Sequence, residues 1–287
     1  MIRRSITLLF ISSALALPAH AFDLGKLLTK ENMDSLSKIG GNIVEANKEI
    51  TPQQEIVMGQ SVMATLLGAA PLVKDPALQK YVNQVGMWVA AQSEQPNLAW
   101  RFGVIDSPNI NAFAAPGGYI LITRGLWEHL RNEAELAAIL GHEITHVLKK
   151  HQIEAMKSTN KGAIYEELLV LGVNNKTKGG AKELGRKAAK ATTEGFYIKG
   201  LSKDAEYEAD IGGMVLAARA GYNPYAMVSV LQTLGNVSPS DTSVALFFST
   251  HPSPKDRLDQ IDSKVGDQLE AYAEGAENTA RFNKIKK

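Results

Sequence analysis

The sequence contains no cysteine. This absence excludes disulfide bonds, cysteine catalysis, thiolate metal ligands and a lipidated N-terminal cysteine on this chain. A chain without thiols is also unharmed by an oxidising compartment, which fits export without indicating it.

The sequence also has almost no net charge, since 31 basic and 30 acidic residues leave +1 over 287 residues. A near-neutral chain gives no electrostatic reason to bind nucleic acid, so we expect no nucleic-acid partner. With 45% hydrophobic and 21% charged residues, the composition is that of an ordinary globular protein of one domain or at most two. We find no internal repeat and no interdomain linker.

Long apolar runs are confined to the N-terminus, where "SITLLFISSALAL" follows Arg3 and Arg4 and precedes "PAHAFD". This order predicts a signal peptide over residues 1–21, cleaved after Ala21 because Ala19 and Ala21 form an A-x-A pattern. Cleavage would remove two arginines and no acid, which changes the formal charge from +1 to −1. The run is too short for a retained transmembrane helix, although a short membrane anchor is the alternative. We expect no transmembrane segment in the mature chain.

Helix and strand patterns follow one another over residues 51–265. Thr51–Pro52 and Asp75–Pro76 each place a capping residue before a proline, as at helix starts. "AWRFGVIDS" and "NAFAAPGGYILIT" have the alternation of strands, and the turn-prone "SPN" between them suggests that they are neighbours in a small, mostly antiparallel sheet. We therefore predict a mostly helical α+β domain, preceded by a helical segment over residues 22–50 and followed by a polar tail over 266–287 with a frayed end.

Residues 174–190, "NNKTKGGAKELGRKAAK", hold six basic residues, one acid and three glycines. Such a stretch is typical of a solvated surface segment. The alternative is a lid or a membrane-surface contact near the active cleft.

The segment "RNEAELAAILGHEITHVLKKH" is the strongest helix pattern in the chain, and Asn132 with Glu135 resembles a capping box at its start. On that helix His142 and His146 lie four residues apart, so both imidazoles can reach one ion. Glu143 lies one position round, where its carboxylate can accept a proton from a metal-bound water without ligating the metal. The spacing predicts a metal site.

A catalytic zinc needs a third protein ligand and an open position for water. His151 lies about two and a half turns beyond His142 on a continuous helix, so we expect it to point away from the ion. His129 precedes the helix and has the character of a surface histidine.

A better source of the third ligand is the helix that begins after Ser202. Glu206 and Asp210 share one face of it, so if Glu206 binds the metal, Asp210 can accept the N–H of a ligating histidine. Glu208 points elsewhere and should be solvated. The pair Gly212–Gly213 would let this helix pack close to the first one.

Together with "EYEAD", "THPSPKDRL" and "INAFAAPGGYILITRGLWEHL", the motif "HEITH" resembles the zinc metallopeptidase family of the CAAX prenyl endopeptidases and HtpX-like proteases. The chain is most similar to the soluble, exported bacterial branch of that family. The resemblance covers roughly residues 51–262 and rests on separated motifs in the right order. It implies a zincin-type, gluzincin-like metallopeptidase fold with a small sheet beside the active-site helix.

The resemblance also implies a role for each matching residue. His142, His146 and Glu206 would bind one zinc ion per chain, and Glu143 would be the general base. Asp210 would accept a hydrogen bond from a ligating histidine without binding the zinc itself.

Four further positions follow from the same resemblance. His251 could donate to the oxyanion of the reaction intermediate, or it could close the site as a fourth ligand. Arg257, which completes the H-P-x-x-x-x-R pattern with His251, would support the metal ligands together with Asp210. The alternative is a purely structural pairing of Arg257 with a carboxylate. "NAFAAPGGYI" would be a strand that lines the cleft and pairs with an extended peptide, so Asn111 and Ala112 are candidates for substrate contact.

We therefore expect a zinc metalloendopeptidase in the periplasm that degrades unfolded or misassembled envelope proteins. Polypeptides would be its substrates, and outer-membrane or envelope proteins its partners, with peripheral attachment to the outer membrane as an option. The sequence lacks the membrane helices of integral-membrane members, and we expect no C-terminal helical-repeat domain.

Two rival interpretations remain. The first is a chaperone-like binding protein in which His142, His146, Glu206 and His251 close a structural zinc site. The intact Glu143 argues against it, because a structural site needs no base. The second is a metal-free helical protein.

Overall fold

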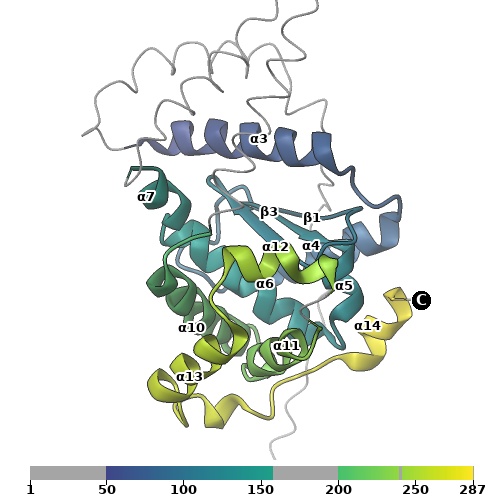
Figure 1. Cartoon of the computed structure of the whole chain (residues 1–287), viewed down its shortest axis with the longest axis vertical. Helices are drawn as coiled ribbons and strands as arrows, with labels where there is room; N and C mark the ends of the chain where they lie inside the picture. The colour runs from purple at the N-terminus through teal and green to yellow at the C-terminus, as the bar shows by residue number, and fades with distance from the viewer. Residues whose placement is uncertain (1–49, 158–199, 239–240, 287) are drawn as a thin grey trace, which may run out of the picture.

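The computed structural model of the chain describes residues 50–157, 200–238 and 241–286 (Figure 1). The predicted signal peptide, nearly all of the predicted segment 22–50 and the basic segment 174–190 lie outside these residues. Within the described ranges, no helix combines the length and the hydropathy that crossing a bilayer requires. The elements in chain order are α3 (Pro52–Ala69), α4 (Pro76–Ala90), β1 (Arg101–Ile105), β2 (Ala112–Ala115), β3 (Tyr119–Thr123), α5 (Arg124–His129), α6 (Glu133–Leu148), α7 (His151–Lys157), α10 (Lys203–Arg219), α11 (Ala226–Gly235), η1 (Thr242–Val244), α12 (Ala245–Thr250), α13 (Pro254–Lys264), η2 (Glu270–Tyr272) and α14 (Thr279–Ile285).

The predicted α+β class is confirmed, because helices surround one three-stranded sheet in the described part of the chain. The sheet is mixed rather than mostly antiparallel. Its order is β1-β3-β2, with β3 parallel to β1 and antiparallel to β2. The expected second strand is a hairpin that turns at Gly117 and Gly118, whose φ angles of 81° and 91° suit glycine. The "SPN" segment therefore leads from β1 to the far edge of the sheet, not to its neighbour.

The sheet separates two apolar layers because alternate strand residues face opposite sides. Ile120 and Ile122 face the large core that includes α4 and α6. Tyr119 and Leu121 face the opposite side, where α3 covers the sheet with Val62, Met63, Leu66 and Leu67 (Figure 1).

Helix α6 is central to the larger layer and packs against α4, α10, α11 and the sheet. It begins as predicted: Asn132 Oδ1 accepts from the Glu135 amide at 2.9 Å, while the Glu135 carboxylate reaches back to the Arg131 amide at 2.7 Å. Ser202 caps α10 by accepting from the Ala205 amide. These caps fix the start of both helices that carry the metal-binding candidates.

Helices α6 and α10 approach each other through glycine. A methyl group at Gly213 would lie 2.8 Å from the backbone nitrogen of His142, and one at Gly141 would lie 2.9 Å from the carbonyl oxygen of Gly213. The close packing expected from Gly212–Gly213 is therefore confirmed. It brings the backbone of α10 next to the first histidine of the motif.

Glu133, at the first turn of α6, holds the C-terminal segment on the domain. Its buried carboxylate accepts hydrogen bonds from Tyr81 Oη (2.5 Å), Tyr222 Oη (2.7 Å) and Asn278 Nδ2 (2.9 Å), and it pairs with Arg281. Burial alone would raise the pKa of Glu133, but the hydrogen bonds from Arg281 and the two tyrosines outweigh burial and lower it.

We expected the polar tail over residues 266–287 to have a frayed end, but the described part of it forms helix α14 as far as Ile285. Phe282 on α14 is fully buried, and its ring lies against those of Trp127 and Tyr81. One aromatic residue and one ion pair thus anchor a segment whose composition is otherwise polar.

Replacing Gly213 with alanine should push α10 away from α6. We expect the free energy of unfolding to fall by about 1–3 kcal/mol, as for an overpacked core. Urea denaturation measures this change. Gly68→Ala on α3 is the matched control, since a methyl group there meets nothing within 4 Å, and it should be neutral or stabilising by about 0.5 kcal/mol. Equal stabilities of the two variants would contradict the packing argument.

The Glu133→Gln variant should unfold more easily at pH 7, by about 2–3 kcal/mol, because charged hydrogen bonds are lost. The pKa of Glu133 is lower in the folded protein, so its contribution is present above an unfolded pKa of about 4 and is lost as the pH falls through the folded pKa. The gap between variant and wild type should therefore shrink in urea titrations below about pH 4. Glu94→Gln, at an exposed pair with Arg219, should show little effect, and a constant gap at all pH values would refute this account.

Candidate metal centre

Two histidines of α6 and one glutamate of α10 converge inside the protein. The Nε2 atoms of His142 and His146 are 3.0 Å apart. Glu206 extends its two carboxylate oxygens toward them, with Oε2 3.7 Å from His142 Nε2 and Oε1 3.6 Å from His146 Nε2. Among the described residues, these three form the set of buried side chains able to hold a metal ion.

These separations fit a tetrahedral zinc site. Ligand atoms about 2.1 Å from an ion lie roughly 3.4 Å from one another in tetrahedral geometry. In addition, Glu206 Oε2 is buried and has no hydrogen-bond partner in the described part of the chain. A buried carboxylate oxygen without a partner is costly unless a cation binds it, so the three residues fit a divalent metal.

Asp210 and Arg257 orient the first histidine. His142 Nδ1 donates to Asp210 Oδ1 at 2.9 Å, and Arg257 grips the same carboxylate through Nε (2.8 Å) and Nη2. Burial alone would raise the pKa of Asp210, but the Arg257 charge, its hydrogen bonds and His142 lower it strongly. An ionised Asp210 only accepts, so His142 carries its proton on Nδ1 and directs the Nε2 lone pair at the site.

Arg257 thus has the structural ion pair that the sequence left open. Its side chain is almost completely buried, and its guanidinium lies over the Phe247 ring, 5.8 Å from the centroid. Bidentate pairing with a buried aspartate is a geometry that lysine could not reproduce.

Among the residues that the structure describes, no arginine or lysine pairs with Glu143 or Glu206. Burial, with the nearby charge of Glu206, raises the pKa of Glu143 to about 8. Burial also raises the pKa of Glu206 to about 8, although Arg257 opposes the effect and Asp210 adds to it. Two buried carboxyl groups side by side make this region favourable for a cation.

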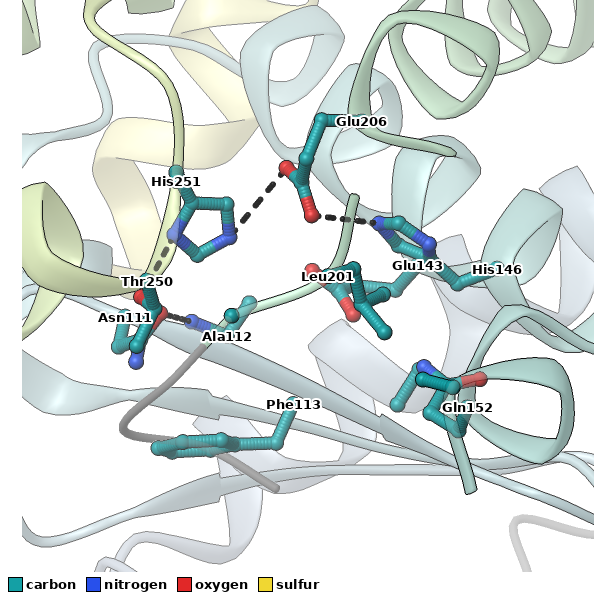
Figure 2. Close-up of a pocket in the computed structure, with 13 residues that line it drawn as sticks. Asn111, Ala112, Phe113, Glu143, His146, Gln152, Leu201, Glu206, Thr250 and His251 are labelled. Atoms are coloured by element: carbon teal, nitrogen blue, oxygen red, sulfur yellow. Dashed lines mark hydrogen bonds and ion pairs between the residues drawn. The ribbon is translucent and has the colours of Figure 1, made fainter. Parts of the chain in front are cut away.

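The metal-binding candidates open onto a pocket between β2 and the two helices (Figure 2). Glu143, His146, Glu206 and His251 lie on one side, and strand β2 forms the other. Leu201, which precedes α10, also lines the pocket. An open approach to the metal position is what a catalytic site requires.

Figure 2 shows His251 extending toward Glu206 from the end of α12. Its Nε2 atom lies 3.6 Å from Glu206 Oε2, and its ring stacks on Phe247 with centroids 4.7 Å apart. The Nδ1 atom is 2.8 Å from Thr250 Oγ1 and 3.3 Å from the Phe247 carbonyl oxygen. Phe247 lies four residues before His251, about one helical turn away. This spacing is visible in the sequence, but we did not use it to predict that the two rings stack.

Asn111 and Ala112 line the same pocket at the start of β2. The Asn111 Oδ1 atom accepts from the Ala112 amide at 2.9 Å, and the Asn111 backbone pairs with Thr123 through Oγ1 and the amide. These bonds hold the Asn111 carboxamide at the pocket wall.

The structure places the other acidic and histidine candidates outside the metal cluster, but one of them, His151, is not where we expected. His151 does not point away, because its Nδ1 atom lies 2.8 Å from Nδ1 of His146. Glu208 is half exposed, as expected, yet it contacts His151 and Lys149. His129 is remote and contacts the Gly125 carbonyl.

Comparison with known proteins identifies relatives of the chain. Residues 76–265 match the sequence profile of peptidase family M48. The chain is 29% identical to the beta-barrel assembly-enhancing protease of Yersinia pestis over 88% of its own length and 51% of that protein. It is 31% identical to the putative beta-barrel assembly-enhancing protease of Vibrio cholerae over 74% and 44%. It is 27% identical to the mitochondrial metalloendopeptidase OMA1 of Arabidopsis thaliana over 77% and 43%. The chain thus spans about half the length of these relatives.

Removing the partner of Asp210 should destabilise the domain even without metal. We expect Arg257→Gln to lower the free energy of unfolding by about 3–5 kcal/mol, because a buried charge loses its counterion. Urea denaturation of chelator-treated protein measures this. Arg124→Gln is the control, since Arg124 forms exposed pairs with Asp106 and Glu128 and should change little. A loss no larger than the control's would show that the pair is not structural.

Proposed function

Because this chain belongs to peptidase family M48 and has an intact His-His-Glu metal site, we propose that it is a zinc-dependent endopeptidase acting on extended polypeptides. The observation that carries the proposal is the placement of Glu143 beside three buried, convergent ligand atoms at the base of an open pocket.

Zinc is the metal that the ligand set favours. Two imidazoles and one carboxylate, with room for water, are a usual ligand set for catalytic zinc. Burial lowers the pKa of His146 well below its usual value, and the neighbouring histidines add to the effect, so this ligand is neutral as metal binding requires. We assign one zinc per chain to His142, His146 and Glu206.

Bound zinc would polarise the scissile carbonyl and acidify a water molecule. Glu143 lies in the pocket beside His146, and no lysine or arginine of the described residues pairs with it. A cation at the metal position would favour its ionised form, and the carboxylate could then accept the water proton and pass it to the leaving amine. Asp210 and Arg257 keep His142 in one tautomer during this proton transfer.

Strand β2 is the candidate platform for the substrate. It is the last strand of the order β1-β3-β2 in the described part of the sheet, and it forms the pocket wall opposite Glu143 and His146. A peptide lying along it would present its backbone to the metal position with little dependence on side chains, which suits unfolded substrates. Asn111 and Ala112 would contact that backbone near the cleaved bond.

The biological role that we propose is quality control of envelope proteins in the periplasm, with outer-membrane or other envelope proteins as partners. The support is the signal-peptide pattern of residues 1–21 and the names of the relatives, which are proteases that enhance beta-barrel assembly.

His251 is the residue on which the rival function depends. Its Nδ1 atom faces two oxygens, one of them a backbone carbonyl that can only accept, so Nδ1 carries the proton of the neutral ring and Nε2 faces Glu206 with a lone pair. This tautomer suits a fourth metal ligand better than a donor to an oxyanion. A zinc site closed by His251 would bind metal without hydrolysing peptides.

A Glu143→Gln variant should separate the two functions. We expect it to keep about one zinc per chain, as the three-ligand site predicts, and to lose about 10²–10⁴-fold in casein hydrolysis, the usual contribution of a general base. Zinc content by elemental analysis and fluorescent-casein hydrolysis measure the two effects. Glu128→Gln, at an exposed position on α5, is the matched control.

Hydrolysis by Glu143→Gln at the wild-type rate would contradict the assignment of the base. If zinc is bound but the wild type does not cleave casein, His251→Ala tests the closed site, because opening it should start hydrolysis. A His251→Ala variant that is also inactive would leave the chain without the proposed activity.

A further inference from the structure

A chain of hydrogen bonds connects the metal candidate His146 to the protein surface. His146 Nδ1 is 2.8 Å from His151 Nδ1, His151 Nε2 is 3.2 Å from Glu208 Oε2, and Lys149 Nζ is 2.6 Å from Glu208 Oε1. Exposure increases along it: the side chains of His146, His151 and Glu208 are 2%, 10% and 47% exposed.

A break in the helix separates His146 from His151. Helix α6 ends at Leu148, and Lys150 has a φ of 56°, in the left-handed region. A new helix, α7, begins at His151, so this residue does not occupy the position that a continuous α6 would give it. The Lys150 side chain pairs with Glu55 of α3 at 2.6 Å, which holds the turn in place.

The hydrogen bonds fix the protonation of both rings. Glu208 is paired with Lys149 through Oε1, and its other oxygen, Oε2, accepts a hydrogen bond from His151 Nε2. In the neutral ring, His151 Nδ1 then has a lone pair and accepts the proton on His146 Nδ1. His146 is left with its Nε2 lone pair directed at the metal position, 3.6 Å from Glu206 Oε1.

We infer that His151 is a positioning residue for His146, supported from outside by Glu208 and Lys149. The inference rests on the proposed zinc site and adds to it a residue that touches neither metal nor substrate. His142 is oriented by a buried carboxylate, Asp210, whereas His146 is oriented by a histidine backed by a half-exposed carboxylate. The two histidines of α6 are therefore oriented by different hydrogen-bond partners.

The partner of a ligating histidine typically contributes about 10–100-fold to metal affinity. His151→Phe keeps a ring of similar size but has no acceptor, so it should weaken zinc binding by about that factor. His151→Asn places an oxygen near the position of Nδ1 and should restore most of the affinity. Glu208→Ala, at a half-exposed position, should give a smaller loss in the same direction.

The experiment measures the zinc dissociation constant of the purified full chain by competition with a chromophoric chelator. The melting temperature of the metal-free protein is recorded in parallel, because a purely structural role would change it. His129→Phe is the matched control, since His129 lies outside the cluster and its Nδ1 atom contacts the Gly125 carbonyl oxygen. Asp259→Asn, at the exposed pair with Lys255, controls for Glu208→Ala.

Weaker binding in His151→Phe, recovery in His151→Asn and unchanged controls would support the inference. Wild-type affinity in both His151→Phe and Glu208→Ala would overturn it while leaving the zinc site intact. Equal losses in the Phe and Asn variants, together with a lower metal-free melting temperature, would assign His151 a packing role and also overturn it. A wild-type chain that binds no zinc would instead refute the proposed function.

Discussion

The contact between α6 and α10 is the constraint on which the site depends. Gly141 and Gly213 face each other where the helices cross, and a methyl group at either would meet backbone atoms at 2.8–2.9 Å. With no side chain between the helices, the Glu206 and Asp210 carboxylates reach the two sides of the His142 ring. Metal ligands and their supporting carboxylate thus come from a single crossing, which the caps at Asn132 and Ser202 fix in register.

The buried carboxylates at this helix crossing are of two kinds, which differ in whether an arginine neutralises them. Asp210 is neutralised by Arg257 and keeps a lowered pKa, so it serves as a permanent acceptor for His142. In the described part of the chain no arginine or lysine pairs with Glu206 or Glu143, and burial raises the pKa of each. Asp210 therefore stays ionised and supports His142, whereas Glu206 can bind a cation and Glu143 can accept a proton.

The fold and site were predictable where the signal is local. The caps at Asp75, Asn132 and Ser202, and the four-residue spacings of the histidines and of Glu206 and Asp210, depend on one helix at a time. The order of the strands was not predictable, because the sequence pattern of "NAFAAPGGYILIT" does not distinguish one strand with a break from a hairpin of two strands, and it does not show which of them pairs with β1. The position of His151 was predicted wrongly, because the sequence pattern suggests one helix through His151, whereas α6 ends at Leu148 and Lys150 is left-handed. The ordered C-terminus depends on Phe282 and on Arg281 meeting Glu133, contacts between residues far apart in the sequence.

The most direct test of the central claim is a crystal structure of the full chain loaded with zinc, with diffraction recorded on both sides of the zinc absorption edge. We predict one anomalous peak per chain. It marks an ion bound by His142 Nε2, His146 Nε2 and the Glu206 carboxylate at about 2.0–2.2 Å, while the Glu143 carboxylate lies beside the ion without binding it. A peak elsewhere, or none at this position in protein that contains zinc, would contradict it.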